Sequence, residues 1–348
     1  MHAFIGLLKP VHDETLSSWM SRMYQKRYFD GALTAALEQL AAEHPYLKGD
    51  SDFLYELPTF LSYFTPVQQS EIAIRFRMPE SDVTVPSLSS KYCSECFKED
   101  ISNLLVPIWR KSWRISGAAV CLNHPRPVLL SRLIQYPKDL RERGWQGFKE
   151  HLESPASRLL TNFPIMSTSY SKAAANNEKL LLLVKRVQCW YQTHTCKHPR
   201  IPLSLNSLRF LMGIWLHQAD PPKLSPGIAR ACFQSAPGRQ CRSNAGRLTA
   251  PEMSIDTAAP RELAVAYWLM GVSYGVITHE EAIFIRETIR STFLTFPTTK
   301  MQIAAATTSN YLDEGLSRLI YEAKCTLALD EFREVSWVLL RLLRSKDF

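Results

Sequence analysis

The chain has 348 residues, of which 46% are hydrophobic, and carries a net charge of +8. This length predicts two or three domains, and the apolar fraction is large enough to form buried cores. No run of 18 apolar residues occurs, so we expect no membrane-spanning helix. The N-terminal MHAFIGLLKP is too short and too poor in early charge for a signal peptide. Eight cysteines in a chain of this size make no disulfide framework and suit a reducing cytoplasm.

Residues 1–90 predict a helical region that contains a helix-turn-helix. Asp13 is a suitable N-cap for a helix that runs to about Arg27. The apolar side chains of this helix recur on one face: Leu16, Trp19, Met20 and Met23. Further helices are expected over residues 30–43 and 66–76, and Pro79 can open a short helix over PESDV. The last two helices, joined by a tight turn, have the shape of a helix-turn-helix.

Four residues within 91–130 have the spacing of metal ligands. Cys93 and Cys96 form a C-x2-C pair, and Cys121 and His124 form a C-x2-H pair beyond residues 97–120. Three thiolates and one imidazole suit a tetrahedral zinc ion and leave no open coordination position. The sequence therefore predicts one structural, non-hydrolytic zinc in a zinc ribbon. The alternative is four unrelated core residues, because free cysteine is often buried.

The segment between the two pairs runs VPIWRKSWRISGAAVC, from Val106 to Cys121. Apolar and basic residues alternate in it, which predicts a short strand or hairpin, with Gly117 at a turn. Exposed basic residues on such a strand can contact a phosphate backbone. Arg110 and Arg114 are therefore candidate nucleic-acid contacts.

Three stretches together resemble the TniQ family of transposon-targeting proteins: YCSECFKED, WRKSWRISGAAVCLNH and the N-terminal KPVHDETLSSWMSRM. In that family a cysteine knuckle, a W-R-x2-W stretch and a C-x2-H pair close one zinc ribbon. The family also opens with a proline, then D-E-S/T-L and an S-W at a helix start. The resemblance covers about the first third of the chain.

Residues 131–175 predict an irregular connector with one helix near 140–152, and Ser167 to Asn177 is a linker in composition. Residues 176–348 predict an all-helical domain. Its strongest helices are expected at about 176–193, 204–218, 260–275, 278–294 and 330–344.

A second helix-turn-helix is predicted near residues 300–323. This motif requires a small residue where the two helices approach, a residue that tolerates a left-handed conformation in the turn, and aliphatic residues in the core. The spacing of five residues matches these requirements: Gln302, Ala306, Asn310, Leu316 and Leu319. An ordinary helical hairpin meets part of the same pattern. A helix that recognises DNA bases usually carries hydrogen-bond donors near its start. The second helix of each predicted motif instead has acidic residues there: Glu80 and Asp82 in the first motif, Asp313 and Glu314 in the second. This favours packing of both motifs against protein, unless nearby basic residues outweigh the acids: Arg75, Arg77 and Arg318.

Residues 221–251 form a loop with five basic residues and no acidic one: Lys223, Arg230, Arg239, Arg242 and Arg247. Such a loop can follow a phosphate backbone, and Arg239, Arg242 and Arg247 are its candidate contacts; it can equally be a disordered surface loop. A second metal group is a weaker candidate, because it lacks a partner knuckle: Cys189, His194, Cys196 and His198.

The expected fold is mostly α, with one zinc ribbon between two helical regions. The sequence shows no catalytic constellation, and a zinc-containing enzyme is the least favoured alternative. The resemblance implies a bacterial, cytoplasmic, non-enzymatic adaptor, nucleoid-associated when active. It would link the RNA-guided Cascade effector to the AAA+ regulator TnsC near target DNA, often as a head-to-tail homodimer. The other alternative is a direct attachment-site reader of the TnsD kind. Candidate dimer or partner contacts are Leu16, Trp19, Leu316 and Leu319.

Overall fold

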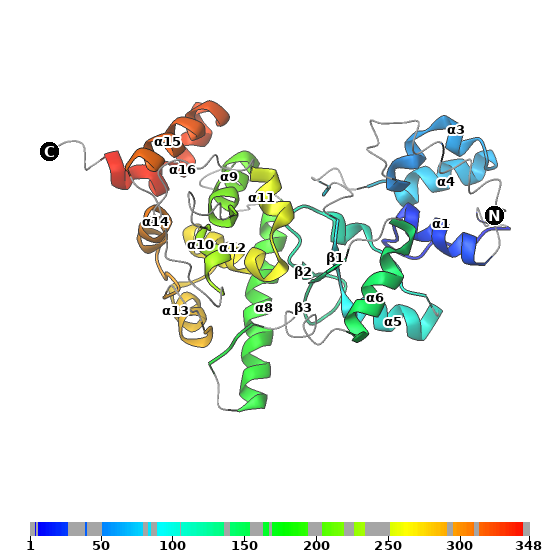
Figure 1. Cartoon of the computed structure of the whole chain (residues 1–348), viewed down its shortest axis with the longest axis horizontal. Helices are drawn as coiled ribbons and strands as arrows, with labels where there is room; N and C mark the ends of the chain where they lie inside the picture. The colour runs from blue at the N-terminus through cyan, green and yellow to red at the C-terminus, as the bar shows by residue number, and fades with distance from the viewer. Residues whose placement is uncertain are drawn as a thin grey trace. The chain divides into compact units, whose positions relative to one another are not determined.

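The computed structural model describes most of the chain and shows a mostly helical protein with few, short strands (Figure 1). The described residues are 4, 6–26, 39, 51–78, 83–84, 89–104, 106–135, 140–153, 163–166, 169–193, 204–218, 226–233, 251–290, 295–309 and 313–343. The chain forms two compact units, residues 1–123 with 130–161, and residues 124–129 with 162–348. Within the described ranges, no helix is long and apolar enough for a bilayer crossing.

Helix α1 (Leu16–Gln25) opens the first unit, and its N-cap is Thr15, whose hydroxyl accepts from the Ser18 N–H. The prediction of Asp13 as N-cap is wrong by two residues. Asp13 has φ 63°, a left-handed conformation that aspartate tolerates better than most residues, and turns its carboxylate toward Ser112. The predicted apolar face is confirmed, since all four of its side chains are buried: Leu16, Trp19, Met20 and Met23.

This face packs on three short helices: the 3-10 helix η2 (Ser51–Glu56), α3 (Pro58–Leu61) and α4 (Pro66–Phe76). The Trp19 ring is central, with ring centroids of Phe4, Phe64 and Phe76 at 6.1, 6.2 and 5.2 Å. Helix α4 has the predicted bounds, because a capping box of Thr65 and Gln68 closes its N-terminus. The expected helix over 30–43 lies outside the described residues, apart from residue 39.

The short helix expected after Pro79 is wrong at its last residue, because Val83 forms a β-bridge with Ile115. The rest of that segment, with Glu80 and Asp82, lies outside the described residues. The prediction of a short strand or hairpin within 106–121 is wrong for the middle of the segment, although its last two residues do form a strand. Its middle is a 3-10 helix, η4 (Lys111–Arg114), and its extended ends pair with other parts of the unit, Arg110 with Glu14 and Ile115 with Val83. Gly117 does form the predicted turn, with φ 79°.

Two small antiparallel ladders and two helices complete the ribbon region. Strand β1 (Lys91–Tyr92) pairs with β4 (Ser131–Arg132), and β2 (Val120–Cys121) pairs with β3 (Val128–Leu129). Helix α5 (Ser94–Leu104) follows β1, and the 3-10 helix η5 (Leu140–Glu142) leads into α6 (Arg143–Glu153). Gly147 lets α6 approach α5, because a Cβ at this position would lie 2.9 Å from the Phe97 ring.

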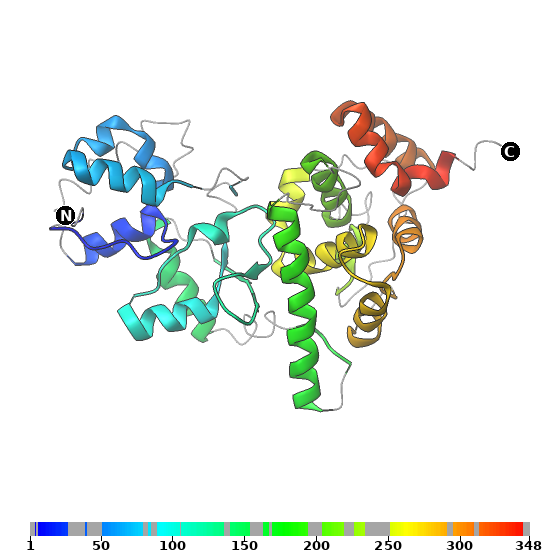
Figure 2. The same cartoon turned by 180° about the vertical axis from the view of Figure 1, so that it is seen from behind.

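The second unit is an assembly of helices (Figure 2). Two fully buried tryptophans, Trp215 and Trp268, lie in its core. Trp215 donates to the Thr307 hydroxyl at 3.1 Å, and Trp268 donates to the Leu180 carbonyl at 3.3 Å. The helices are α8 (Tyr170–Thr193), α9 (Leu205–Leu216), α10 (Ile228–Ala231), α11 (Pro251–Thr257), α12 (Pro260–Ser273), α13 (His279–Thr288), α14 (Lys300–Thr308), α15 (Asp313–Thr326) and α16 (Leu329–Leu343).

Two boundaries in this unit differ from prediction. Helix α8 begins at Tyr170, inside the predicted linker, because Ala173, Ala174 and Ala175 favour helix. Helix α13 ends at Thr288, since the next residue, Ile289, pairs with Ile165. The two predicted helices near 300–323 are present as α14 and α15, and both pack against α16. The turn residue Asn310 lies outside the described residues.

Candidate metal centre

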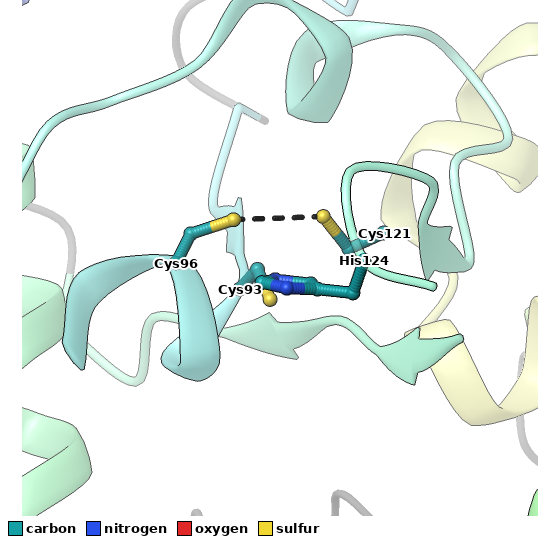
Figure 3. A group of neighbouring side chains, drawn as sticks. All are labelled: Cys93, Cys96, Cys121 and His124. Carbon is teal, nitrogen blue, oxygen red and sulfur yellow. Dashed lines mark hydrogen bonds between the residues drawn. The ribbon is translucent and has the colours of Figure 1, made fainter. Parts of the chain in front are cut away.

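The four predicted metal ligands meet at one point. Cys93 directly follows β1, Cys96 lies in the first turn of α5, Cys121 ends β2, and His124 lies in the turn that leads to β3 (Figure 3). All four side chains are buried, and their ligand atoms lie within 4.8 Å of one another. The Sγ atoms of Cys96 and Cys121 are 3.7 Å apart. Two sulfurs at 2.3 Å from a tetrahedral zinc would be about 3.8 Å apart, so the spacing fits this ion.

The electrostatics of the cluster favour a bound cation. Burial, together with the neighbouring thiols of Cys121 and Cys96, raises the pKa of Cys93 well above its usual value. The hydrogen bond with Cys121 is the main cause that raises the pKa of Cys96 to about 12. The thiols of Cys93 and Cys96 therefore resist ionisation by themselves. A divalent metal reverses this, because a coordinating thiol is deprotonated. All three cysteines are free of disulfides.

The ribbon region is hydrogen-bonded to the N-terminal segment through the motifs that the sequence singled out. Thr15 N–H donates to the Trp109 carbonyl at 2.9 Å, and Trp109 N–H donates to the Ser18 hydroxyl at 3.1 Å. The Ser112 hydroxyl donates to the Asp13 carboxylate at 2.5 Å. The D-E-T-L and W-R-x2-W motifs therefore bind each other, and their residues are used inside the fold.

Buried ion pairs also lie within the first unit. Glu14 is 1% exposed and accepts from Arg22 at 2.6 Å. Asp52 is fully buried and pairs with Arg114 and, at 2.9 Å, with Arg143. Sequence reasoning missed Asp52 and Arg143, because no local pattern connects them with each other or with Arg114.

Arg110 and Arg114 were expected to contact nucleic acid, and the structure corrects this expectation. Arg114 is fully buried, pairs with Asp52 and donates to the Thr84 carbonyl at 3.0 Å. Arg110 pairs with Asp100 at 2.5 Å and is 8% exposed. Both guanidinium groups thus face protein carboxylates and not solvent, where a phosphate backbone would lie.

The four expected dimer or partner contacts are also core residues. Leu16 and Trp19 are fully buried in the first unit, while Leu316 and Leu319 are 5% and 1% exposed in the second. Such side chains stabilise their own unit and leave little surface for another chain.

The remaining predicted sites lie wholly or partly outside the described residues. These include Arg239, Arg242, Arg247 and the later part of the weaker metal group, His194, Cys196 and His198. Cys189 lies on α8 and is partly buried. Arg230, from the same basic loop, lies on α10, where it donates to the Ser254 carbonyl at 3.0 Å and pairs with Glu262. It therefore serves the fold.

Comparison with known proteins gives a family match over about the first third of the chain. The model of the TniQ family matches residues 7–128, which contain the interlocked motifs and all four candidate metal ligands. No curated protein and no solved structure matches the chain.

Proposed function

The chain carries a TniQ domain over residues 7–128, and from this premise we propose that it is a zinc-binding, non-enzymatic adaptor in DNA transposition. In this proposal the adaptor couples an RNA-guided Cascade effector to the AAA+ regulator TnsC and so selects the integration target. It works in the bacterial cytoplasm, near target DNA, as a head-to-tail homodimer. The observation that carries the proposal is the buried Cys93, Cys96, Cys121 and His124 cluster inside the matched domain.

The metal is proposed to be one zinc ion per chain. Among the residues described, this cluster is the one group of three or more candidate ligands that lie close enough together. Four protein ligands complete a tetrahedron, so a zinc held there has no position for a substrate or a reactive water. Its role is to join β1, α5 and the β2–β3 turn into one ribbon.

The adaptor role is favoured over direct reading of a DNA sequence. Arg110 and Arg114, the basic residues of the W-R-x2-W motif, are used in buried ion pairs. Helix α15 begins with the acidic pair Asp313 and Glu314, whereas a recognition helix usually presents donors to bases near its N-terminus. The net charge of +8 supports the alternative, a TnsD-like attachment-site reader, because it favours binding to DNA.

Co-purification tests the adaptor role. We expect the tagged full-length chain to retain Cascade with guide RNA, and to recruit TnsC to that complex. A matched sample without guide RNA, and therefore without assembled Cascade, controls for adhesion of a basic protein. An adaptor role would be contradicted if Cascade is not retained in 150 mM salt, where exposed charges are screened beyond roughly 8 Å.

The isolated chain is expected to bind duplex DNA weakly and without sequence preference. Its positive charge attracts phosphates, and each neutralised phosphate releases about 0.9 counterion, so affinity should fall steeply as salt rises. Fluorescence anisotropy with two unrelated duplexes at several salt concentrations measures this. Tight binding to one of the two duplexes at physiological salt would instead support the TnsD-like reader.

A further inference from the structure

Arg110 connects the candidate metal cluster with a buried carboxylate. Its Nη2 donates to Asp100 Oδ1 at 2.5 Å, and its Nη1 donates to the His12 carbonyl at 3.1 Å. The remaining nitrogen of this guanidinium group, Nε, is buried, and its N–H has no hydrogen-bond partner among the described residues. A buried donor without an acceptor is destabilising, so an acceptor for this group is expected in the working protein.

Cys96 is the group beside Arg110 that can become this acceptor. Arg110 lies close enough to Cys96 for the two side chains to make a hydrogen-bond contact. A metal-bound sulfur would be a thiolate with lone pairs to accept.

The charge of a loaded site gives a reason for this contact. Three thiolates, one neutral imidazole and Zn²⁺ sum to a net charge of −1 in a buried place. A buried charge of this kind needs a partner of opposite sign or hydrogen-bond donors. Arg110 supplies both, and Asp100 holds it in position by accepting from it and from the Ile108 N–H at 3.1 Å.

We propose that Arg110 is a positioning residue of the metal centre, whose Nε–H donates to the Cys96 thiolate and stabilises the bound ion. The inference rests on the zinc site of the proposed function. It assigns a role to the first arginine of the W-R-x2-W motif, which is too buried to contact nucleic acid. It also connects the metal to the N-terminal segment, since the same guanidinium group binds the His12 carbonyl.

The test uses Asp100→Asn as its reference, because removal of Arg110 alone would leave the buried Asp100 charge without its partner. The test variant is Asp100→Asn with Arg110→Met. The matched control is Asp100→Asn with Lys98→Met, which removes a charge from the same helix as Cys96 but at an exposed side chain. Zinc affinity is measured by competition with a chromogenic chelator. We expect the test variant to bind zinc about 10–100-fold more weakly than the reference, and the control to match the reference.

Cobalt substitution gives a readout that a purely structural role would not change. In the Co²⁺-loaded protein, loss of a hydrogen bond to a thiolate raises the energy of the sulfur lone pair. The thiolate-to-cobalt charge-transfer band should therefore move to longer wavelength in the test variant alone. If that variant does not fold, Arg110→Lys in the same background is used, since lysine keeps the charge without the planar Nε donor; the same direction of change is expected.

The outcomes separate the two proposals. If the wild-type chain binds no zinc, the proposed zinc centre is wrong. If the wild-type chain binds one zinc, and the test variant keeps the affinity and the charge-transfer band of the reference, the role of Arg110 is wrong while the zinc centre stands.

Discussion

Cys121→Ser is expected to release the metal and unfold the first unit, residues 1–123 with 130–161. The binding free energy of structural zinc, about 10–16 kcal/mol in small zinc domains, is folding free energy, since the unfolded chain has no preformed site. The effect should extend beyond the ribbon, because Thr15 and Ser18 are hydrogen-bonded to Trp109. Elemental analysis should find about one zinc per wild-type chain and none in the variant. Circular dichroism should show loss of helix.

Cys325→Ser is the matched control for this experiment. Cys325 is exposed on α15 in the second unit, so the same atom exchange there should leave zinc content and helicity unchanged. A wild-type protein with no zinc, or with two, would contradict the single four-ligand site. A Cys121→Ser variant that keeps a folded N-terminal helix α1 would show that the ribbon and this helix fold independently.

Asp52→Ala should be the most damaging substitution away from the metal. Asp52 is fully buried between Arg114 and Arg143, and also accepts from the Ser17 N–H at 2.9 Å. Removal of one member of a buried ion pair typically costs about 3–5 kcal/mol, because the remaining charge stays buried without compensation. Chemical denaturation of the full chain, followed by tryptophan fluorescence, should show this loss in the first unit.

Glu71→Ala is the control for Asp52→Ala. Glu71 pairs with Arg75 at 2.9 Å on the surface of α4, and an exposed pair of this kind contributes about 0–1 kcal/mol. If both variants unfold at the same denaturant concentration as the wild type, the Asp52 pairs contribute nothing measurable to stability.

The Asp52 pairs also predict how stability depends on pH. Burial acts to raise the pKa of Asp52, but Arg143 and Arg114 outweigh it and hold this pKa well below its usual value of 3.8. A carboxylate with a lowered folded-state pKa contributes stability that is present above the unfolded value and lost as pH falls below it. The wild type should therefore lose stability below about pH 4 more steeply than Asp52→Ala, which has no carboxylate there.

The sequence predicted best where physical requirements are local. The four candidate metal ligands lie in two tight pairs, so their residue types and spacing were enough to predict their meeting. The bounds of α4 followed from a proline at N1 and a capping box, which are features of neighbouring residues. The buried face of α1 followed from helical periodicity for the same reason.

The features that the sequence did not predict depend on interactions between distant segments. Arg110 and Arg114 have the alternation of a half-exposed strand, yet both are buried because Asp100 and Asp52 come from other elements. The N-cap of α1 moved to Thr15 because Asp13 is used by Ser112. Residues close in sequence give no indication of these distant partners, so the local patterns favoured the wrong interpretation.

The ion pair between Asp52 and Arg143 has a consequence for protein synthesis. The two residues are 91 positions apart, so at 5–20 residues per second the ribosome adds Arg143 on the order of ten seconds after Asp52. During this interval Asp52 first lacks both arginine partners, and after Arg114 has been added it still lacks Arg143. A fragment that ends at residue 128, where the family match ends, would remain in that state permanently. The family match and the compact unit that contains most of it therefore end at different residues.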